Sequence, residues 1–370
     1  PNQICLLYLR SWDMKSNYDI LGNHIRLIDT RNRESITDRV LGINIDKFFM
    51  PSVANVIGTD LSKYKLITKG KFACNPMHVG RDERLPVALY DEEEPAIVSP
   101  AYFMFEVIDN SILNEDYLMM WFRRPEFDRI CWLHTDGSVR GGITWDDICR
   151  LELPIPPIEN QLEIVNSYKA ITERIALKQK INDNLDDTAQ TLYQKYFESN
   201  SDKSSWKQGT VGDVLQLQRG HDLPRTEMTG GKYPVAGSTG TIGYHDEFTA
   251  EAPVIVMGRS GNIGNPRLYL CNCWTHNTSL YVKQIYEAEP LWVFYLLKNL
   301  NYDGFVGGSA VPTLNRNDVH AYGIAIPPLE LQKSFSQKVM SLIYCKEENL
   351  SEIEKLQELQ KIILTTMSSR

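Results

Sequence analysis

The sequence predicts an α+β protein in which two similar mixed α/β domains are separated by two long helices that pair as an antiparallel coiled coil. Three observations predict this fold: a duplication within the chain, a stretch without glycine or proline at the end of each copy, and a heptad pattern in both stretches. A self-match at so long a spacing indicates a duplicated domain rather than a solenoid of short repeats. Antiparallel pairing of the helices would relate the two domains by an approximate two-fold axis.

The duplication is clearest from residue 137 onward, where two rows of sequence match without a gap at a spacing of 171 residues. Within these rows, residues 153–161 correspond to residues 324–332. The starts of the two domains match more weakly, as Leu21-Gly22 against Val211-Gly212. We therefore expect a first domain at residues 1–153, a first helix at 154–200, a second domain at 201–326 and a second helix at 327–370.

Both domains are predicted to contain short strands joined by polar loops. In the first domain, β-like runs at 85–90 and 96–107 lie between turn signals. In the second, glycines such as Gly237, Gly240 and Gly258 divide a β-rich segment. The loops carry Arg, Asn, Ser and Thr side chains, which can hydrogen-bond to base edges and phosphates. Ordinary β-turns with polar tips are the competing interpretation.

Each long helix is predicted to begin at a Pro-Pro pair. Proline suits the first helical turn, and the residue before it is driven away from α-helical geometry, so Pro157 marks a start. A carboxylate in the first turn, here Glu159, is favoured by the helix dipole. Neither glycine nor proline follows until a Ser- and Asn-rich linker at residues 199–205. Each helix of about 40 residues would be about 60 Å long.

The heptad positions of the two helices stay in one register, as two helices packing on each other require. They fall on Tyr168, Ile171, Ile175, Lys178, Asn182, Leu185, Ala189, Leu192 and Tyr196 in the first helix, and on Val339, Leu342, Lys346, Asn349, Ile353, Leu356, Gln360, Ile363 and Met367 in the second.

Antiparallel pairing with Asn182 opposite Asn349 sets one register for the whole coiled coil. It places Ile175 against Leu356, Tyr168 against Ile363, Leu192 against Val339 and Tyr196 against Phe335. A shift by one heptad would bury an unpaired amide at a cost of about 1–3 kcal/mol, so we expect the asparagines to select the register. The alternative is that both asparagines face solvent or a docked partner.

Composition narrows the class of protein. The net charge is −8, from 39 Lys and Arg against 47 Asp and Glu, which argues against a nucleic-acid coat protein but permits local basic surfaces. The 7 cysteines are odd in number and scattered, which favours a reducing, cytoplasmic setting. No run of about 18 apolar residues occurs, so no membrane span is expected. Cys271, Cys273 and His276 lack a second ligand pair at zinc-site spacing, so no metal site is expected.

The search for catalytic motifs is negative. The sequence contains no phosphate-binding loop of the GxxxxGK[ST] type, no GxSxG nucleophile elbow and no HExxH zinc motif. It also lacks the Asn/Asp-Pro-Pro-Tyr/Phe tetrad with which amino-methyltransferases hold a target base. Nothing in the sequence therefore indicates a catalytic apparatus.

Taken together, these features resemble the specificity subunits of type I restriction–modification enzymes over nearly the whole chain. The Pro-Pro-Ile/Leu-x-x-Gln helix start of that family appears twice, at residues 156–161 and 327–332. Three further stretches resemble family signatures, at residues 64–72, 240–244 and 254–261. The order, duplication and spacing of these motifs carry the resemblance.

The resemblance implies a non-catalytic subunit with two target recognition domains. Each domain would read one half of a bipartite sequence in double-stranded DNA, and the helix pair would set the distance between the halves. The helices would dock two methyltransferase subunits that bring S-adenosylmethionine, and a restriction and translocation subunit would use ATP and Mg²⁺ for cleavage. No cofactor is expected in this chain itself.

Loop position and side-chain chemistry suggest which residues contact DNA. In the first domain we predict Lys69, His78, Arg81, Arg84, His134 and Arg140. In the second domain we predict Arg219, His221, Arg259, Asn262, Arg267 and Asn277. Catalytic and metal-binding residues are not expected.

Two other functions compete with DNA reading. One is a coiled-coil adaptor whose duplicated domains bind protein, which the acidic balance of the chain favours. The other is a methyltransferase with its own cofactor site, against which the missing target-base tetrad argues. Residues 1–13 match neither copy of the duplication, so we expect the functional protein to begin at Met14 and the preceding residues to pack loosely.

Overall fold

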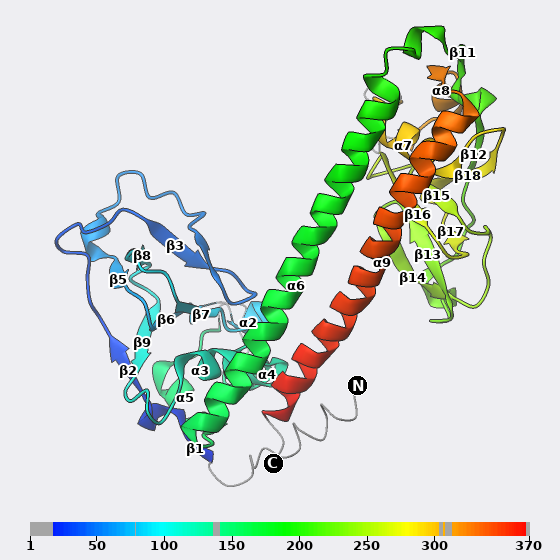
Figure 1. Ribbon diagram of the computed structural model, residues 1–370. Coiled ribbons are helices and arrows are strands. Elements are labelled where there is room, and N and C mark those ends of the chain that lie inside the picture. The colour runs from blue at the N-terminus through cyan, green and yellow to red at the C-terminus, as the bar shows by residue number, and fades with distance from the viewer. Residues whose placement is uncertain (1–17, 78, 136–140, 303–305, 308–312, 368–370) are drawn as a thin grey trace. The chain divides into compact units, whose positions relative to one another are not determined.

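The computed structural model describes residues 18–77, 79–135, 141–302, 306–307 and 313–367, so the expectations for the N-terminus, His78 and Arg140 fall outside it. The chain divides into two compact units, the first made of Pro1–Leu177 and Glu352–Arg370 and the second of Lys178–Ser351. The two long helices, α6 (Ile158–Tyr193) and α9 (Leu329–Thr366), each contribute to both units (Figure 1).

The described residues of the first unit form three sheets, with strand orders β2-β9-β6-β7, β4-β3-β8-β5 and β1-β10. Its strands are β1 (Tyr18–Ile20), β2 (Ile25–Ile28), β3 (Val40–Ile43), β4 (Phe49–Pro51), β5 (Lys65–Ile67), β6 (Lys71–Cys74), β7 (Val87–Tyr90), β8 (Ala96–Val98), β9 (Phe103–Val107) and β10 (Glu152–Pro154). Its shorter helices are α2 (Val79–Asp82), α3 (Glu115–Phe122), α4 (Pro125–Leu133) and α5 (Trp145–Cys149). The run predicted at 96–107 is two strands, because a turn at 99–102 that contains Pro100 interrupts it.

The second unit repeats this plan. Its strands are β11 (Lys207–Thr210), β12 (Leu215–Arg219), β13 (Tyr233–Gly237), β14 (Gly240–His245), β15 (Val254–Gly258), β16 (Gly264–Tyr269), β17 (Trp274–Thr275), β18 (Ser279–Ile285), β19 (Val306–Gly307), β20 (Thr313–Leu314) and β21 (Gly323–Ile326). Its shorter helices are α7 (Pro290–Asn299) and α8 (Arg316–His320), and α6 continues as one π-helical turn at Gln194–Glu198. Helix α7 lies beside the strands of this unit (Figure 1).

The sheets of the two units match in topology except for β5 of the first unit and the β19-β20 pair of the second. The order β2-β9-β6-β7 corresponds to β12-β18-β15-β16, and β1-β10 corresponds to β11-β21. The order β4-β3-β8 corresponds to β14-β13-β17. The pairs β3-β8 and β13-β17 are both parallel. The starts of the two domains, which match only weakly in sequence, make equivalent backbone hydrogen bonds. The Leu21 N–H donates to the Leu151 oxygen at 2.7 Å, and the Val211 N–H donates to the Tyr322 oxygen at 2.9 Å. The predicted fold class is confirmed.

A buried glutamine ties the first long helix to its domain. Gln161 is 0% exposed, and its Nε2 donates to the backbone oxygens of Ile112 and Pro156, both at 2.8 Å. Its Oε1 accepts a hydrogen bond from the backbone N–H of Asn114 at 2.9 Å. Because Asn114 is the N-cap residue of α3, one side chain joins the starts of two helices.

The same arrangement recurs in the second unit. Gln332 is 1% exposed, donates to the Pro327 oxygen at 2.8 Å and accepts from the backbone N–H of Glu289 at 2.9 Å. Glu289 is the N-cap residue of α7, as Asn114 is of α3. The glutamine of the duplicated Pro-Pro motif therefore has a structural role, since each buried backbone group that it contacts requires a partner.

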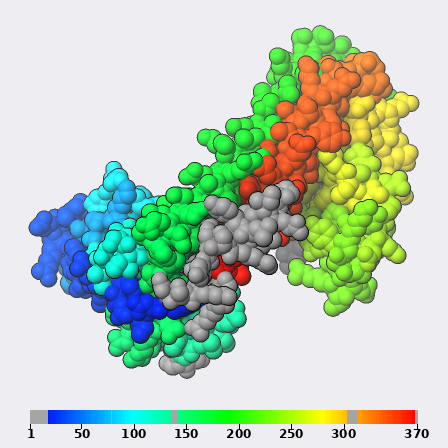
Figure 2. All heavy atoms as spheres, turned by 60° about the horizontal axis from the view of Figure 1, so that its bottom comes forward, coloured from blue at the N-terminus to red at the C-terminus, as the bar shows by residue number. Residues whose placement is uncertain are grey.

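The segments of α6 and α9 within each unit pair antiparallel. In the first unit, Gln360 donates to Thr172 at 2.7 Å and Arg174 donates to Glu352 at 2.6 Å. In the second, Lys346 donates to Asp186 at 2.5 Å. As the residue numbers of these contacts increase along α6, they decrease along α9, so the helices are antiparallel as predicted. Figure 2 shows the green end of α6 and the orange start of α9 packed together in the second unit.

The predicted register of the helices is also confirmed. Nδ2 of Asn349 donates to Oδ1 of Asn182 at 2.9 Å, and the two side chains are 7% and 5% exposed. Nζ of Lys178 donates to Oδ1 of Asn349 at 2.8 Å, so this amide uses both its oxygen and its nitrogen. Tyr196 and Phe335, predicted to be opposite each other, have ring centroids 5.9 Å apart.

We expect Gln332→Leu to loosen the junction between α7 and α9. Leucine removes both hydrogen bonds, and each buried backbone group left unpaired costs about 1–3 kcal/mol. Amide hydrogen exchange of peptides from α7 should accelerate by roughly 5- to 150-fold in the variant. Gln337→Leu changes an exposed glutamine of the same helix and should leave exchange as it is. Equal exchange in both variants would refute the role assigned to Gln332.

We expect Asn182→Ala to destabilise the second unit by about 1–3 kcal/mol, because the buried Nδ2 of Asn349 loses its acceptor. Urea unfolding of the purified chain measures this as a lower midpoint. Asn184→Ala removes an exposed asparagine two residues further along α6 and serves as the matched control. The register argument is wrong if both variants unfold at the same urea concentration.

Candidate nucleic-acid interface

Three arginine side chains of the second unit line one hollow, which has a volume of about 410 Å³. Arg219 ends β12, Arg259 follows β15, and Arg316 begins α8. The remaining lining residues are Leu280, Thr313, Leu314 and Asn315. No carboxylate is among the residues that line the hollow. Arg219 also forms an ion pair with Asp222, an exposed residue outside this lining, at a distance of 3.8 Å between Nη2 and Oδ1.

Backbone geometry holds the arginines at the hollow. The Arg259 oxygen accepts a hydrogen bond from the Leu314 N–H at 2.8 Å, which joins the loop after β15 to the strand before α8. Gly258 permits this turn, because a Cβ there would lie 1.5 Å from the Asn262 oxygen. The Asn315 side chain caps α8 by accepting from the Asn317 N–H at 3.0 Å. Nε of Arg219 donates to the backbone oxygen of Asn277 at 3.4 Å.

Four of the six residues predicted in the second domain lie close to one another. Arg219 and Arg259 line the hollow, and the Asn277 oxygen accepts from Arg219. Asn262 follows Arg259 in the same loop and donates from Nδ2 to the Ser238 oxygen at 3.2 Å. The Asn277 side chain is hydrogen-bonded to Asp222.

The other two predicted residues of the second domain contact different elements. The His221 ring lies 6.2 Å from the Trp274 ring, and the His221 backbone N–H donates to the Thr275 oxygen at 2.7 Å. Arg267 projects from β16 over Gly240, where a Cβ would lie 2.8 Å from its Nη1. Neither His221 nor Arg267 lines the hollow.

Three cations predicted in the first domain are paired with carboxylates. Lys69 pairs with Glu93, whose hydrogen bond raises the pKa of Lys69. Arg81 pairs with Asp82 at 2.6 Å, and Arg84 pairs with Asp46 at 3.0 Å. Exposed ion pairs of this kind contribute about 0–1 kcal/mol, so a phosphate can replace the carboxylate at little cost.

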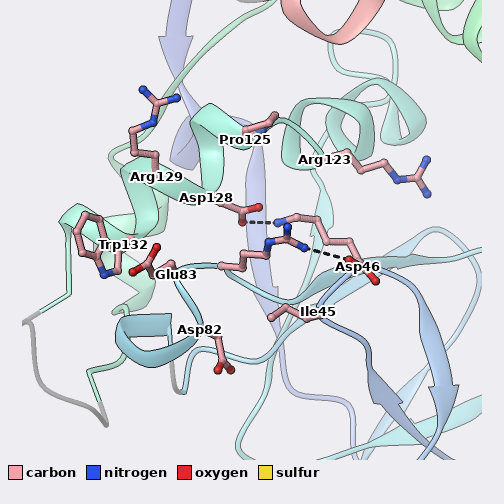
Figure 3. Close-up of a pocket in the computed structure, with 11 residues that line it drawn as sticks. Ile45, Asp46, Asp82, Glu83, Arg123, Pro125, Asp128, Arg129 and Trp132 are labelled. Atoms are coloured by element: carbon pink, nitrogen blue, oxygen red, sulfur yellow. Dashed lines mark hydrogen bonds and ion pairs between the residues drawn. The ribbon is translucent and has the colours of Figure 1, made fainter. Parts of the chain in front are cut away.

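A second hollow, of about 510 Å³, lies in the first unit beside Arg84. Arg123, Arg129 and Trp132 also line it, and Figure 3 shows the guanidinium groups of Arg123 and Arg129 directed outward. Within the described ranges, neither arginine forms an ion pair with a carboxylate. The predicted His134 is exposed and caps the C-terminal end of α4, the helix that carries Arg129 and Trp132.

A buried ion pair lies in this hollow (Figure 3). Nζ of Lys47 lies 2.6 Å from Oδ1 of Asp128 and 2.9 Å from the Leu85 oxygen, and the same carboxylate accepts from the Leu85 N–H at 3.1 Å. Burial lowers the pKa of Lys47, while Asp128 acts in the opposite direction. The pair satisfies the backbone of the residue that follows Arg84, and so it positions the loop that carries this predicted side chain.

Arg123, Arg129, Trp132 and Arg316 line the two hollows and were not predicted from the sequence. The sequence signal that could have drawn attention to Arg316 is the difference between the two copies at this position, where the first copy has Trp145. Arg129 and Trp132 are three residues apart on one helix, which places them on one face.

No group of three His, Cys, Asp or Glu side chains in the described ranges is arranged to hold a metal ion. In the same part of the chain, the helices are all too short or too polar to cross a membrane.

Comparison with known proteins points to one family. Residues 203–362 match the family model of the type I restriction modification DNA specificity domain. A protein of Methanocaldococcus jannaschii, provisionally assigned as the specificity subunit of the type I restriction enzyme MjaX, is 21% identical over 95% of this chain and 88% of its own length. The specificity subunit of the Haemophilus influenzae type I restriction enzyme HindI is 24% identical over 51% of this chain and 40% of its own length.

Solved structures agree in fold. The type I restriction–modification S subunit from M. genitalium has a TM-score of 0.62 at 16% identity, covering 96% of both chains. A chain from a study of complex assembly and conformational transition in the type I restriction–modification system has a TM-score of 0.50 at 15% identity, covering 95% of this chain and 97% of its own. The chain is thus similar in sequence, over residues 203–362 and against both relatives, to the specificity subunits of type I restriction–modification systems, and it shares their fold.

Proposed function

We propose that this chain reads a bipartite DNA sequence for a type I restriction–modification system and carries no catalytic site of its own. The observation that carries the proposal is the arginine-lined hollow, which is built on one copy of a duplicated domain. Two copies of one domain can contact two stretches of DNA through the same backbone geometry, while different side chains read different bases. The relatives named as specificity subunits support the same role.

In this proposal each domain reads one half of the target, and the paired segments of α6 and α9 set the spacing between halves. Two methyltransferase subunits dock on the helices and bring S-adenosylmethionine. A restriction and translocation subunit, with ATP and Mg²⁺, adds cleavage. These partners also account for the net charge of −8, because they supply phosphate contacts that an acidic chain alone makes poorly.

The direct test is to map methylated adenines in the host genome with the gene present and with the gene deleted. The proposal predicts that one bipartite motif loses its methylation in the deletion strain. An unchanged methylation map would contradict it.

The rival function is a coiled-coil adaptor whose domains bind protein, which the acidic composition favours. A salt titration separates the two functions, because only phosphate contacts make the logarithm of the DNA affinity fall steeply with the logarithm of salt concentration. The titration uses this chain assembled with its modification subunits. A flat dependence, or no DNA binding by the assembly, would favour the adaptor.

Exchanging residues 206–320 for the matching segment of another family member should change only one half of the methylated motif, because each domain reads one half. The motif is obtained by sequencing methylated DNA from cells that express the chimera. The reciprocal exchange of the first domain should change only the other half. A change in both halves after a single exchange would show that the domains do not read independently.

Inserting one heptad into each of α6 and α9 at matched positions should lengthen the spacer of the motif and leave both halves intact. Seven helical residues add about 10 Å, which corresponds to about 3 base pairs of DNA. An insertion into α6 alone breaks the pairing of Asn182 with Asn349 and is expected to abolish assembly rather than shift the spacer. An unchanged spacer after the double insertion would refute the role given to the helices.

A further inference from the structure

The two units provide an internal comparison for the arginine hollow. In the second unit, the Leu314 N–H donates to the Arg259 oxygen at 2.8 Å. In the first unit, the Ile143 N–H donates to the Pro76 oxygen at 3.1 Å. Leu314 and Ile143 lie 171 residues apart in the matched rows, so Pro76 occupies the place of Arg259.

Strand register identifies the counterpart of Arg219. In the second unit, Val256 lies three residues before Arg259 and is paired with Tyr281 of the neighbouring strand. In the first unit, Ala73 lies three residues before Pro76 and is paired with Met104. Tyr281 therefore corresponds to Met104. Across the next strand pair, Tyr281 opposes Gln218 and Met104 opposes Ile28. The residue that follows is Arg219 in the second unit and Asp29 in the first.

The third arginine has an aromatic counterpart. Arg316 follows the N-cap Asn315 of α8, and Trp145 follows the N-cap Thr144 of α5, at the same spacing of 171 residues. The three arginines thus correspond to Asp29, Pro76 and Trp145.

In the first unit this place is filled differently. The Trp145 ring packs edge-on against Phe103 with centroids 5.8 Å apart, and Phe103 corresponds to Leu280 of the hollow. Asp29 accepts from Arg31 at 2.9 Å, and this hydrogen bond lowers the pKa of Asp29. The arginine cluster is therefore an addition to the second copy and no part of the shared scaffold.

The difference between the two copies distinguishes binding of the DNA backbone from reading of the bases. The phosphate backbone is the same at both halves of a target, so side chains that bind phosphate are expected at equivalent positions of both domains. Base edges differ between the halves, so side chains that read them must differ. The guanidinium fork matches O6 and N7 of guanine, which is the commonest specific contact in the major groove.

We propose that Arg219, Arg259 and Arg316 form a guanine-reading site that serves only the half of the target bound by the second domain. The inference rests on the proposed function and adds the base that this domain selects and the residues that select it. The first domain has no arginine at the three equivalent positions, which hold Asp29, Pro76 and Trp145.

The test uses the full chain assembled with its modification subunits. Selection from randomised DNA with the wild-type assembly first defines the two halves of the motif. Dissociation constants are then measured for the selected site and for sites with each guanine replaced. Arg259→Ala and Arg316→Ala should each weaken binding of the selected site by roughly 5- to 150-fold. Preference for guanine in the second half should be lost, while preferences in the first half stay unchanged.

Two further variants make the test specific. Arg259→Lys keeps the charge but loses the fork, so it should lose guanine preference as Arg259→Ala does. Arg225→Ala removes an exposed arginine of the same unit that does not line the hollow, and it should change neither affinity nor preference.

Different failures have different meanings. Equal weakening of all DNA sequences by Arg259→Ala, with a shallower salt dependence and full rescue by Arg259→Lys, would identify a phosphate site and overturn the inference. A second half-site without guanine would also overturn it. Failure of the wild-type assembly to bind any bipartite sequence would instead refute the proposed function.

Discussion

The hydrogen bond between the buried side chains of Asn182 and Asn349 decides how the two long helices pair. Apolar side chains along a coiled coil pack almost equally well after a shift of one heptad, so they fix no unique alignment by themselves. A buried amide does, because every other alignment leaves its polar atoms without partners. The contact of Tyr196 with Phe335 follows from this register, as do the ion pairs that flank the asparagines.

The duplicated glutamine plays a comparable part where each helix leaves its domain. Gln161 and Gln332 connect the N-cap of a domain helix to the start of a long helix, with one side chain that is almost fully buried. The spacing between glutamine and N-cap residue differs between the copies, 47 residues in one and 43 in the other, yet the bond is the same. The geometry has been kept although the intervening chain changed length.

On this common scaffold the two copies carry different side chains at equivalent loop positions. One copy presents three arginines around a hollow, and the other presents an aromatic pair beside an ion-paired aspartate. Such a division suits a protein that must bind two DNA segments of like geometry but unlike sequence. It also explains how a chain with a net charge of −8 can concentrate positive charge at one place.

The duplication, the starts of both long helices and their register could be predicted from the sequence, because each has a local signal: a gap-free match, a Pro-Pro pair, and asparagines at heptad positions. Arg219 and Arg259, each of which is next to a glycine, could also be predicted from the sequence. The position of Arg316 beside them is visible only in the folded chain, because α8 begins 57 residues after Arg259 in the sequence. Likewise, only the fold showed that Lys69, Arg81 and Arg84 are paired with carboxylates, since two of those partners come from other strands or loops.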